Sequence, residues 1–397
     1  MASRDKERMI NIYTIDNFLG IQGRFCLIDW LLADNFLSYT DYEAWRYGNI
    51  KYLDEVIQCE PQELQGLLND TDKYCRELAL VAESRDYFSW HSHHPDLLIA
   101  SQHEQFHLRL LQHWQRTQDL PQLDLFMDNS AQIAESELLE IISSRRFETA
   151  QLQLDHLAEL NPESSHLGKY QDLINYGLHL SSNPEINSQT LPVEIQGLKH
   201  EVAPLAHETL GQAARDYLAF AWRYMSRNMQ GLAFDPALPE QHVTSALLQI
   251  PDHAAVVESI ENEPGAYQQP QLLERLAQSY ERIHQQEKTL IIFCLLVERD
   301  IDYAEMALHR CQSQQLQTLW QDFQEYNEKL SVEFFPAFVL LMRPGLLHLL
   351  PGYPDLQHPA SQATQELLRC HQNSKDEIPA RQALQTISPT LLKIYLA

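Results

Sequence analysis

Hydrophobic positions recur at helical spacing along most of the chain. In residues 18–34, one face of a helix would carry Phe25, Ile28, Leu31 and Leu32. Pro61 suits the first turn of another helix, whose apolar stripe would consist of Leu64, Leu67, Leu68, Cys75 and Leu78. Between these two, Thr40 followed by Glu43 predicts a capping box, and Gly48 predicts the end of a short helix. The pattern indicates an all-α fold of helical hairpins.

Two polar segments interrupt this periodicity. Residues 118–132 combine Pro, Asn, Asp, Ser and Gln, and residues 181–195 combine Pro, Asn, Ser and Gln, a composition that breaks helices and favours loops. A helix is expected before the first segment, from about Asp96 to about Thr117. The predicted organisation is an N-terminal helical domain (1–117), a linker (118–132), a helical pair (133–180), a second linker (181–195) and a C-terminal helical array (196–397).

Composition and charge narrow the classes of function. The chain has 397 residues and only 12 glycines, a balance that favours helix. Its formal charge of −26 repels phosphate backbones, so we expect no direct contact with nucleic acid. The small basic groupings, Arg145 with Arg146 and Arg223 with Arg227, are predicted to be solvated or ion-paired.

The same composition bears on the cellular compartment. The longest apolar run, residues 290–297, is too short to cross a bilayer. The six cysteines show no CxxC spacing, and the N-terminus lacks the apolar core of a secretory signal. We therefore expect a cytoplasmic protein that is not bound to a membrane.

One segment carries a repeat-like signature. In residues 138–162, the small, large and helix-ending positions of a helix–turn–helix unit are Ala150, Leu154, Leu157 and Pro162. This segment resembles a tetratricopeptide-repeat unit, although its first helix lacks the Trp and Gly of that family. Fainter versions follow at 299–312 and 380–396. The resemblance implies an irregular TPR-like α-solenoid, a class that holds other proteins. An ordinary irregular helical domain is the alternative.

A metal-binding motif occupies residues 103–107. His103, Glu104 and His107 match H-E-x-x-H, in which two imidazoles one helical turn apart bind zinc and the carboxylate activates water. His113 falls at the third-ligand spacing of the metzincin family, which this stretch resembles. Leu110 stands where that family has the glycine of the turn, so a continuing helix would carry His113 away from the metal. A zinc-dependent hydrolase is therefore the alternative function, and the main prediction includes no cofactor.

A short peptide motif lies in the first linker. Gln122, Leu123, Asp124, Leu125 and Phe126 resemble the pentapeptide with which bacterial polymerases and mismatch-repair proteins dock on the replication sliding clamp, and all five positions match its favoured form. The resemblance implies that Leu125 and Phe126 fill a hydrophobic pocket and that Gln122 forms a hydrogen bond nearby. The alternative is that Leu125 and Phe126 pack under the following helical pair.

These features predict a non-enzymatic interaction scaffold in the bacterial cytoplasm. Its helical array would hold a protein partner, and residues 122–126 would tether it to the sliding clamp as a replication or repair accessory. The sequence contains no glycine-rich phosphate loop, no G-x-S-x-G elbow and no dinucleotide fingerprint. The common classes of NTPase, serine hydrolase and Rossmann dehydrogenase are therefore excluded.

Overall fold

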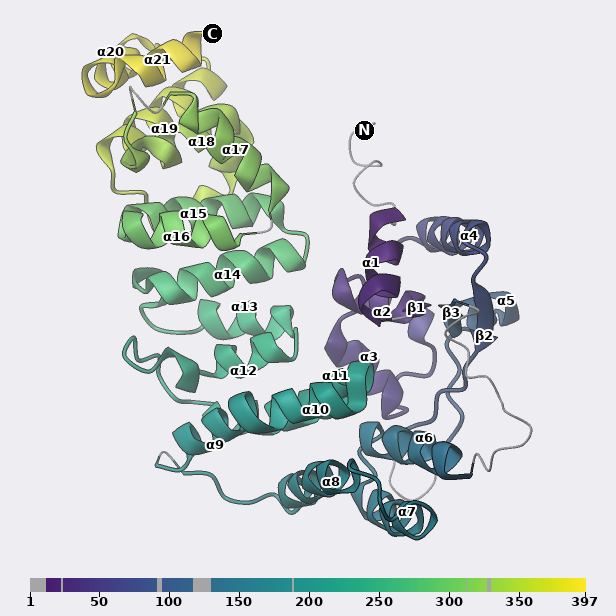
Figure 1. Cartoon of the computed structure of the whole chain (residues 1–397). Helices are drawn as coiled ribbons and strands as arrows, with labels where there is room; N and C mark the ends of the chain where they lie inside the picture. Colours follow the sequence, from purple (N-terminus) through teal and green to yellow (C-terminus); the bar gives the residue numbers. More distant parts are fainter. Residues whose placement is uncertain are drawn as a thin grey trace. The chain divides into compact units, whose positions relative to one another are not determined.

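The computed structural model describes residues 12–22, 24–90, 95–116, 130–187, 189–311, 313–326 and 330–397. Over these residues the chain is mainly α-helical, and its strands form one small sheet (Figure 1). The predicted all-α fold is therefore confirmed. The chain divides into two compact units, Met1–Asn228 with Gln249–Asp252 and Met229–Leu248 with His253–Ala397.

The first unit begins with several helices and a three-stranded sheet. The helices are α1 (Ile12–Gln22), α2 (Leu27–Ala33), α3 (Tyr39–Arg46), α4 (Pro61–Glu77) and α5 (Glu104–Leu110). The antiparallel strands lie in the order β1 (Arg24–Cys26), β3 (Gln112–Gln115) and β2 (Val81–Ser84). Pro61 is the first residue of α4, as predicted, and the apolar stripe of this helix is buried from Leu64 to Cys75. Leu78, by contrast, lies after the helix and is 40 % exposed.

Local sequence patterns mislead at three places in this region. Residues 24–26, inside the helix expected over 18–34, form strand β1 and pair with β3. The helix expected from Asp96 to Thr117 is wrong outside α5, because residues 97 and 99 form isolated bridges and residues 112–115 pair with two strands. The capping residue of α3 is Ser38, whose Oγ accepts a hydrogen bond from the backbone N–H of Asp41, and not Thr40. The predicted capping box of Thr40 and Glu43 is therefore wrong.

Further helices complete the first unit. They are α6 (Ser130–Ser143), α7 (Phe147–Leu160), α8 (Leu167–Ser181), α9 (Leu191–Gly197), α10 (Ala203–Leu210) and α11 (Ala214–Met229). The predicted helix–turn–helix is present as α6 and α7, with Ala150, Leu154 and Leu157 buried. Helix α8 approaches α7 closely because Gly177 has no side chain where the ring of Phe147 lies.

The two predicted linkers lie between these elements. Most of the first, 118–132, is outside the described residues, and α6 begins at Ser130. Within the second, 181–195, residues 183–187 and 189–190 are not helical, and α9 begins at Leu191.

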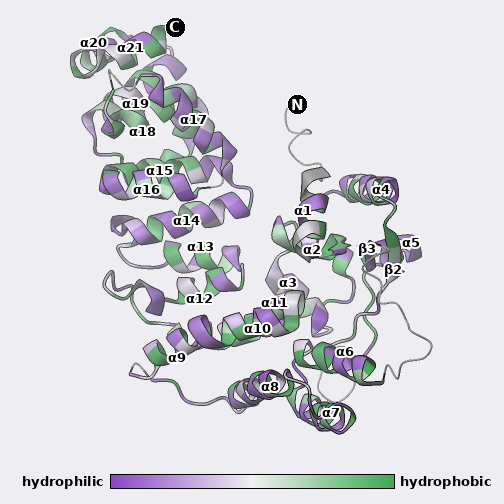
Figure 2. Cartoon of the chain, in the orientation of Figure 1, coloured by the Kyte–Doolittle hydropathy of each residue, from purple (hydrophilic) through white to green (hydrophobic). Residues whose placement is uncertain are grey.

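The second unit is a succession of helices, many of which contact the next one in the chain (Figure 1). They are α12 (Val243–Gln249), α13 (His253–Glu261), α14 (Pro270–Arg282), α15 (Gln286–Arg299), α16 (Ile301–Arg310), α17 (Gln314–Gln324), α18 (Phe335–Met342), α19 (Pro359–Gln372), α20 (Ile378–Ile387) and α21 (Pro389–Leu396). Figure 2 shows both apolar and polar residues on most of these helices, and the apolar ones form one core. Residues 290–297 of α15 are all buried in it. Among the described helices, none is long and apolar enough to cross a membrane.

Candidate functional site

The H-E-x-x-H residues do not form the helical pair that the motif requires. Helix α5 begins at Glu104, and His103 precedes it with an extended backbone (φ −88°, ψ 113°). The side chain of His103 is exposed, and its ring lies against Phe106. His107 is half-buried, and its Nδ1 accepts a hydrogen bond from the backbone N–H of Ala100 at 3.1 Å. Within the described ranges, His, Cys, Asp and Glu side chains form no group of three suited to a metal ion.

His113 is a buried residue of β3 and does not continue the helix of the motif. Its side chain is 4 % exposed, and its Nε2 lies 3.2 Å from the hydroxyl of Tyr87. Burial, together with the charges of Arg24 and Arg85, lowers the pKa of His113 to about 3. The imidazole is therefore neutral at pH 7, as expected for a core histidine.

The pentapeptide that resembles a clamp-binding motif, Gln122, Leu123, Asp124, Leu125 and Phe126, lies outside the described residues. The structure describes the chain on both sides of it. Strand β3 ends at Gln115, and helix α6 begins at Ser130. The motif therefore belongs to the segment that joins these two elements of the first unit.

Charged side chains converge on Glu43 in the first unit. The Oε1 of Glu43 accepts a hydrogen bond from Nη2 of Arg145 at 2.9 Å, and its Oε2 accepts one from Nε of Arg223 at 3.0 Å. Arg223 also donates from Nη1 to Oδ2 of Asp252 at 2.7 Å and from Nη2 to Oγ1 of Thr40 at 3.0 Å. Both carboxylate oxygens of Glu43 are thus occupied by guanidinium groups.

Asp216, on α11, is a second point of convergence. It accepts hydrogen bonds from the hydroxyls of Tyr39 at 3.0 Å and Tyr42 at 3.2 Å. Its carboxylate also lies 3.2 Å from Nε of Arg215 and 3.6 Å from Nη1 of Arg46. We define the charge network as Asp29, Glu43, Arg46, Arg145, Arg215, Asp216, Arg223 and Asp252. It has as many arginines as carboxylates, so its formal charge is zero.

Arg145 has a strained backbone at the turn between α6 and α7. Its φ is 62°, a left-handed conformation that costs a non-glycine residue on the order of 1 kcal/mol. Its guanidinium lies 3.8 Å from the ring centroid of Trp90 and donates hydrogen bonds to the hydroxyl of Tyr47 and the backbone O of Asp216. Arg46 lies 4.5 Å from the same ring centroid. These contacts hold the strained conformation in place.

The interactions within the network shift the pKa values of Asp216 and Arg145 more than burial does. Burial alone raises the pKa of Asp216, but the charges of Arg215, Arg46 and Arg145 bring it below its usual value. Burial alone lowers the pKa of Arg145, but the interactions with Tyr39, Tyr47 and Glu43 raise it overall. Both Asp216 and Arg145 are therefore ionised at pH 7.

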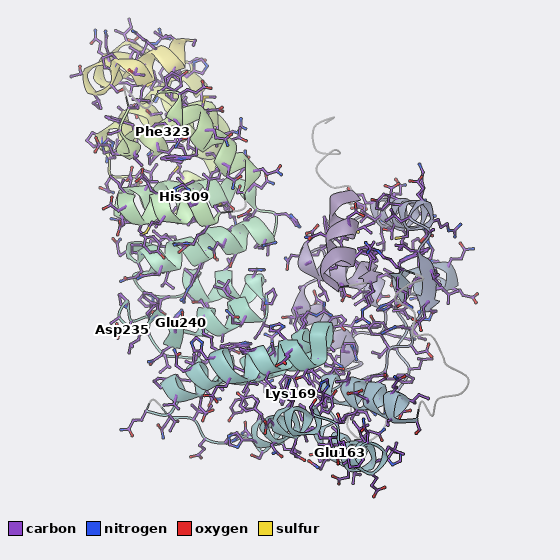
Figure 3. The ribbon with its side chains drawn as sticks, in the orientation of Figure 1. Glu163, Lys169, Asp235, Glu240, His309 and Phe323 are labelled. Atoms are coloured by element: carbon purple, nitrogen blue, oxygen red, sulfur yellow. The ribbon has the colours of Figure 1, made fainter. Side chains whose placement is uncertain are left out.

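Exposed ion pairs of the same unit are screened by solvent more strongly than the buried pairs of the charge network. Nζ of Lys169, on α8, lies 2.7 Å from Oε1 of Glu208 (Figure 3). Both of these side chains are solvated, so water and salt screen their attraction. The side chains of Glu43 and Arg145 are only 10 % and 5 % exposed, and their attraction is screened much less.

A cleft of about 600 Å³ lies beside the charge network. Its walls come from α3, the C-terminal end of α8, and α11, and its lining includes Glu43, Asn49, Arg145, Asn183, Arg223 and Arg227. Its volume falls in the range of small-molecule sites. Three guanidinium groups and one carboxylate thus line a cleft in a chain whose formal charge is −26.

The sequence contained only part of the signal for this site. Ion pairing is confirmed for Arg145 and Arg223 among the basic groupings. The spacing of residues does not connect these two arginines to Glu43 or Asp252, because all four residues come from segments distant in sequence. The signal that the sequence does contain is its composition, in which cations are few and carboxylates many. A buried arginine in such a chain needs a carboxylate partner, so ion pairs are expected wherever an arginine is buried.

Comparison of the chain with protein-family models, with curated proteins and with solved structures gives no match. The functional interpretation therefore depends on the residues of this chain and their arrangement.

Proposed function

We propose that this protein is a non-enzymatic interaction scaffold, tethered to the bacterial sliding clamp through residues 122–126. The observation that carries the proposal is the match at all five positions, Gln122, Leu123, Asp124, Leu125 and Phe126. Two adjacent apolar anchors beside a hydrogen-bonding side chain are the features with which a short peptide binds in a pocket.

The place of the motif in the chain supports this role. It belongs to the segment between Gln115, the end of β3, and Ser130, the start of α6. Elements of the first unit therefore flank the motif on both sides in sequence. Beyond its immediate neighbours Leu120, Pro121 and Met127, the flanking residues 115–119 and 128–132 are mainly polar.

The helices beyond the motif support the scaffold role. Helices α6, α7 and α8 pack in succession. Ile133 on α6 and Leu152 on α7 are 56 % and 70 % exposed, so both are available to a protein partner. The acidic charge of the chain disfavours nucleic acid as that partner.

The proposal is tested by binding of the intact protein to purified bacterial sliding clamp. We expect a saturable interaction with a Kd on the order of micromolar for a single peptide anchor, strengthened by avidity when a dimeric clamp meets an immobilised protein. A Leu125→Ala/Phe126→Ala variant should lose the interaction, because it removes both anchors.

The matched control is Asp124→Ser, which substitutes the other favoured residue at that position and should retain binding. Circular dichroism and thermal unfolding establish that both variants remain folded. Wild-type protein that is folded yet does not bind the clamp at about 100 micromolar, far above the expected Kd, would overturn the tether.

A further inference from the structure

The base of the cleft described above is held rigid by the charge network. Arg145 and Arg223 both reach Glu43, and Arg223 is also fixed by Asp252 and Thr40. The carboxylate of Glu43 is occupied on both oxygens, so it offers little to a bound cation. Arg145 and Arg223 already use Nε, Nη1 and Nη2 in contacts within the fold, so each keeps about one N–H, on Nη1, for a ligand. The base is therefore a rigid, charge-neutral network whose paired guanidiniums still offer N–H donors to the cleft.

The rim of the cleft adds hydrogen-bond donors that the fold does not use. Arg227, in the last turn of α11, is exposed and makes no ion pair or hydrogen bond within the described part of the chain. The side-chain amides of Asn49 and Asn183 also line the cleft, and neither has a side-chain partner among the described residues. Guanidinium and amide N–H groups are donors, and oxygen anions are the acceptors that match them best.

We propose that this cleft binds a small molecule that carries an oxyanion, a phosphate or a carboxylate group. The oxyanion lies between Arg227 at the rim and Arg223 at the base, and the amides of Asn49 and Asn183 donate to it or to a neighbouring oxygen. The volume of about 600 Å³ accommodates a metabolite rather than a folded partner. This binding site is independent of the proposed clamp tether.

The test uses isothermal titration calorimetry on the full chain with pyrophosphate and, separately, with citrate, in 150 mM KCl. Salt at this level weakens non-specific attraction to exposed cations, and the variants below assign the remaining saturable signal to the cleft. Arg227→Gln should weaken binding about tenfold or more, because it removes charge-assisted hydrogen bonds. Arg227 lies outside the charge network, so this variant leaves the network intact.

The matched control is Arg76→Gln, which removes another exposed arginine, from the end of α4. It changes net charge by the same amount and should bind the probe as wild type does. Asn49→Ala is a second variant, with a smaller expected loss of about threefold for one neutral hydrogen bond.

The outcomes separate the sources of the oxyanion. Binding of pyrophosphate alone assigns a phosphate ligand, and binding of citrate alone assigns a carboxylate ligand. Binding of neither probe at about 10 mM, or equal weakening in Arg227→Gln and Arg76→Gln, would overturn the proposal. Leu125→Ala/Phe126→Ala should leave oxyanion binding unchanged, so failure of the tether and failure of the cleft are distinguishable.

Discussion

The two units of the chain differ in the residue types that they bury. In the first unit, the buried polar residues include Glu43, Arg46 and Asp216, which form part of the charge network. Among the described residues of the second unit, no Asp, Glu, Lys or Arg is buried, and the buried polar groups are mostly hydroxyls such as those of Ser279 and Thr289. The core of the second unit is built on a cluster of apolar side chains, with hydroxyl, amide and imidazole groups buried beside it.

This difference has a consequence for specificity. An apolar core tolerates changes that conserve volume and pattern. A buried network of charges requires each partner in place, since a lone buried charge costs far more than a pair. The first unit also contains the cleft, the sheet and the ends of the segment with the clamp motif. We therefore expect the first unit to carry the function and to be the more sensitive to charge substitutions.

The largest predicted effect is that of Arg145→Ala. The substitution leaves Glu43 with one guanidinium fewer and should lower the free energy of unfolding of the first unit by about 3–5 kcal/mol. Urea unfolding measures this change, and hydrogen exchange with mass spectrometry should locate the lost protection in the first unit. Arg76→Ala, at an exposed position, should change the same free energy by no more than about 0.5 kcal/mol. Loss of protection spread equally over both units would contradict the comparison.

The second unit should respond to loss of volume instead. Leu296, on α15, is fully buried, and Leu296→Ala should cost about 3 kcal/mol through lost burial and a cavity. Leu296→Met, which conserves volume, should cost less than about 1.5 kcal/mol. Urea unfolding of the two variants provides the measurement. A methionine variant as unstable as the alanine variant would show that this core is more specific than its composition suggests.

A steric prediction concerns the packing of α8 on α7. A Cβ at Gly177 would overlap the ring of Phe147, which is itself fixed against Tyr217 and Phe220. Gly177→Ala should therefore cost about 2 kcal/mol despite the better helix propensity of alanine. Gly168→Ala in the same helix meets no atom within 4 Å and should stabilise the unit by about 0.5 kcal/mol. Thermal unfolding should show a lower melting temperature for Gly177→Ala and a higher one for Gly168→Ala than for the wild type.

Apolar periodicity was sufficient to predict much of the fold. It predicted α4 from Pro61 and the helical pair around Ala150, because those helices bury one face and follow local rules. It failed over residues 96–117, where pairing with distant strands overrides helical spacing. Strand partners are distant in sequence, so no local window reveals them.

The candidate site was harder to predict for a related reason. Glu43 fits the spacing of a capping box with Thr40, but in the fold Ser38 caps α3 and Glu43 holds two arginines. Residue type and spacing describe only the neighbours along the chain. Partners such as Arg223 become visible only when α11 is placed beside α3.

The smallest predicted effect is a dependence of stability on pH that belongs to the first unit. Burial lowers the pKa of His113 to about 3, whereas the unfolded chain titrates near 6.5, so at intermediate pH the unfolded state binds more protons. Stability from this group is complete above pH 6.5 and falls as pH decreases toward 3. Between pH 7 and pH 5.5 we expect a loss of about 1 kcal/mol.

Urea unfolding at the two pH values measures the loss, and His113→Gln should reduce it because glutamine does not titrate. His309→Gln is the control, since His309 is exposed on α16 of the second unit (Figure 3). An identical pH dependence in wild type and His113→Gln would show that other groups of the first unit, and not the buried imidazole, set its response to acid.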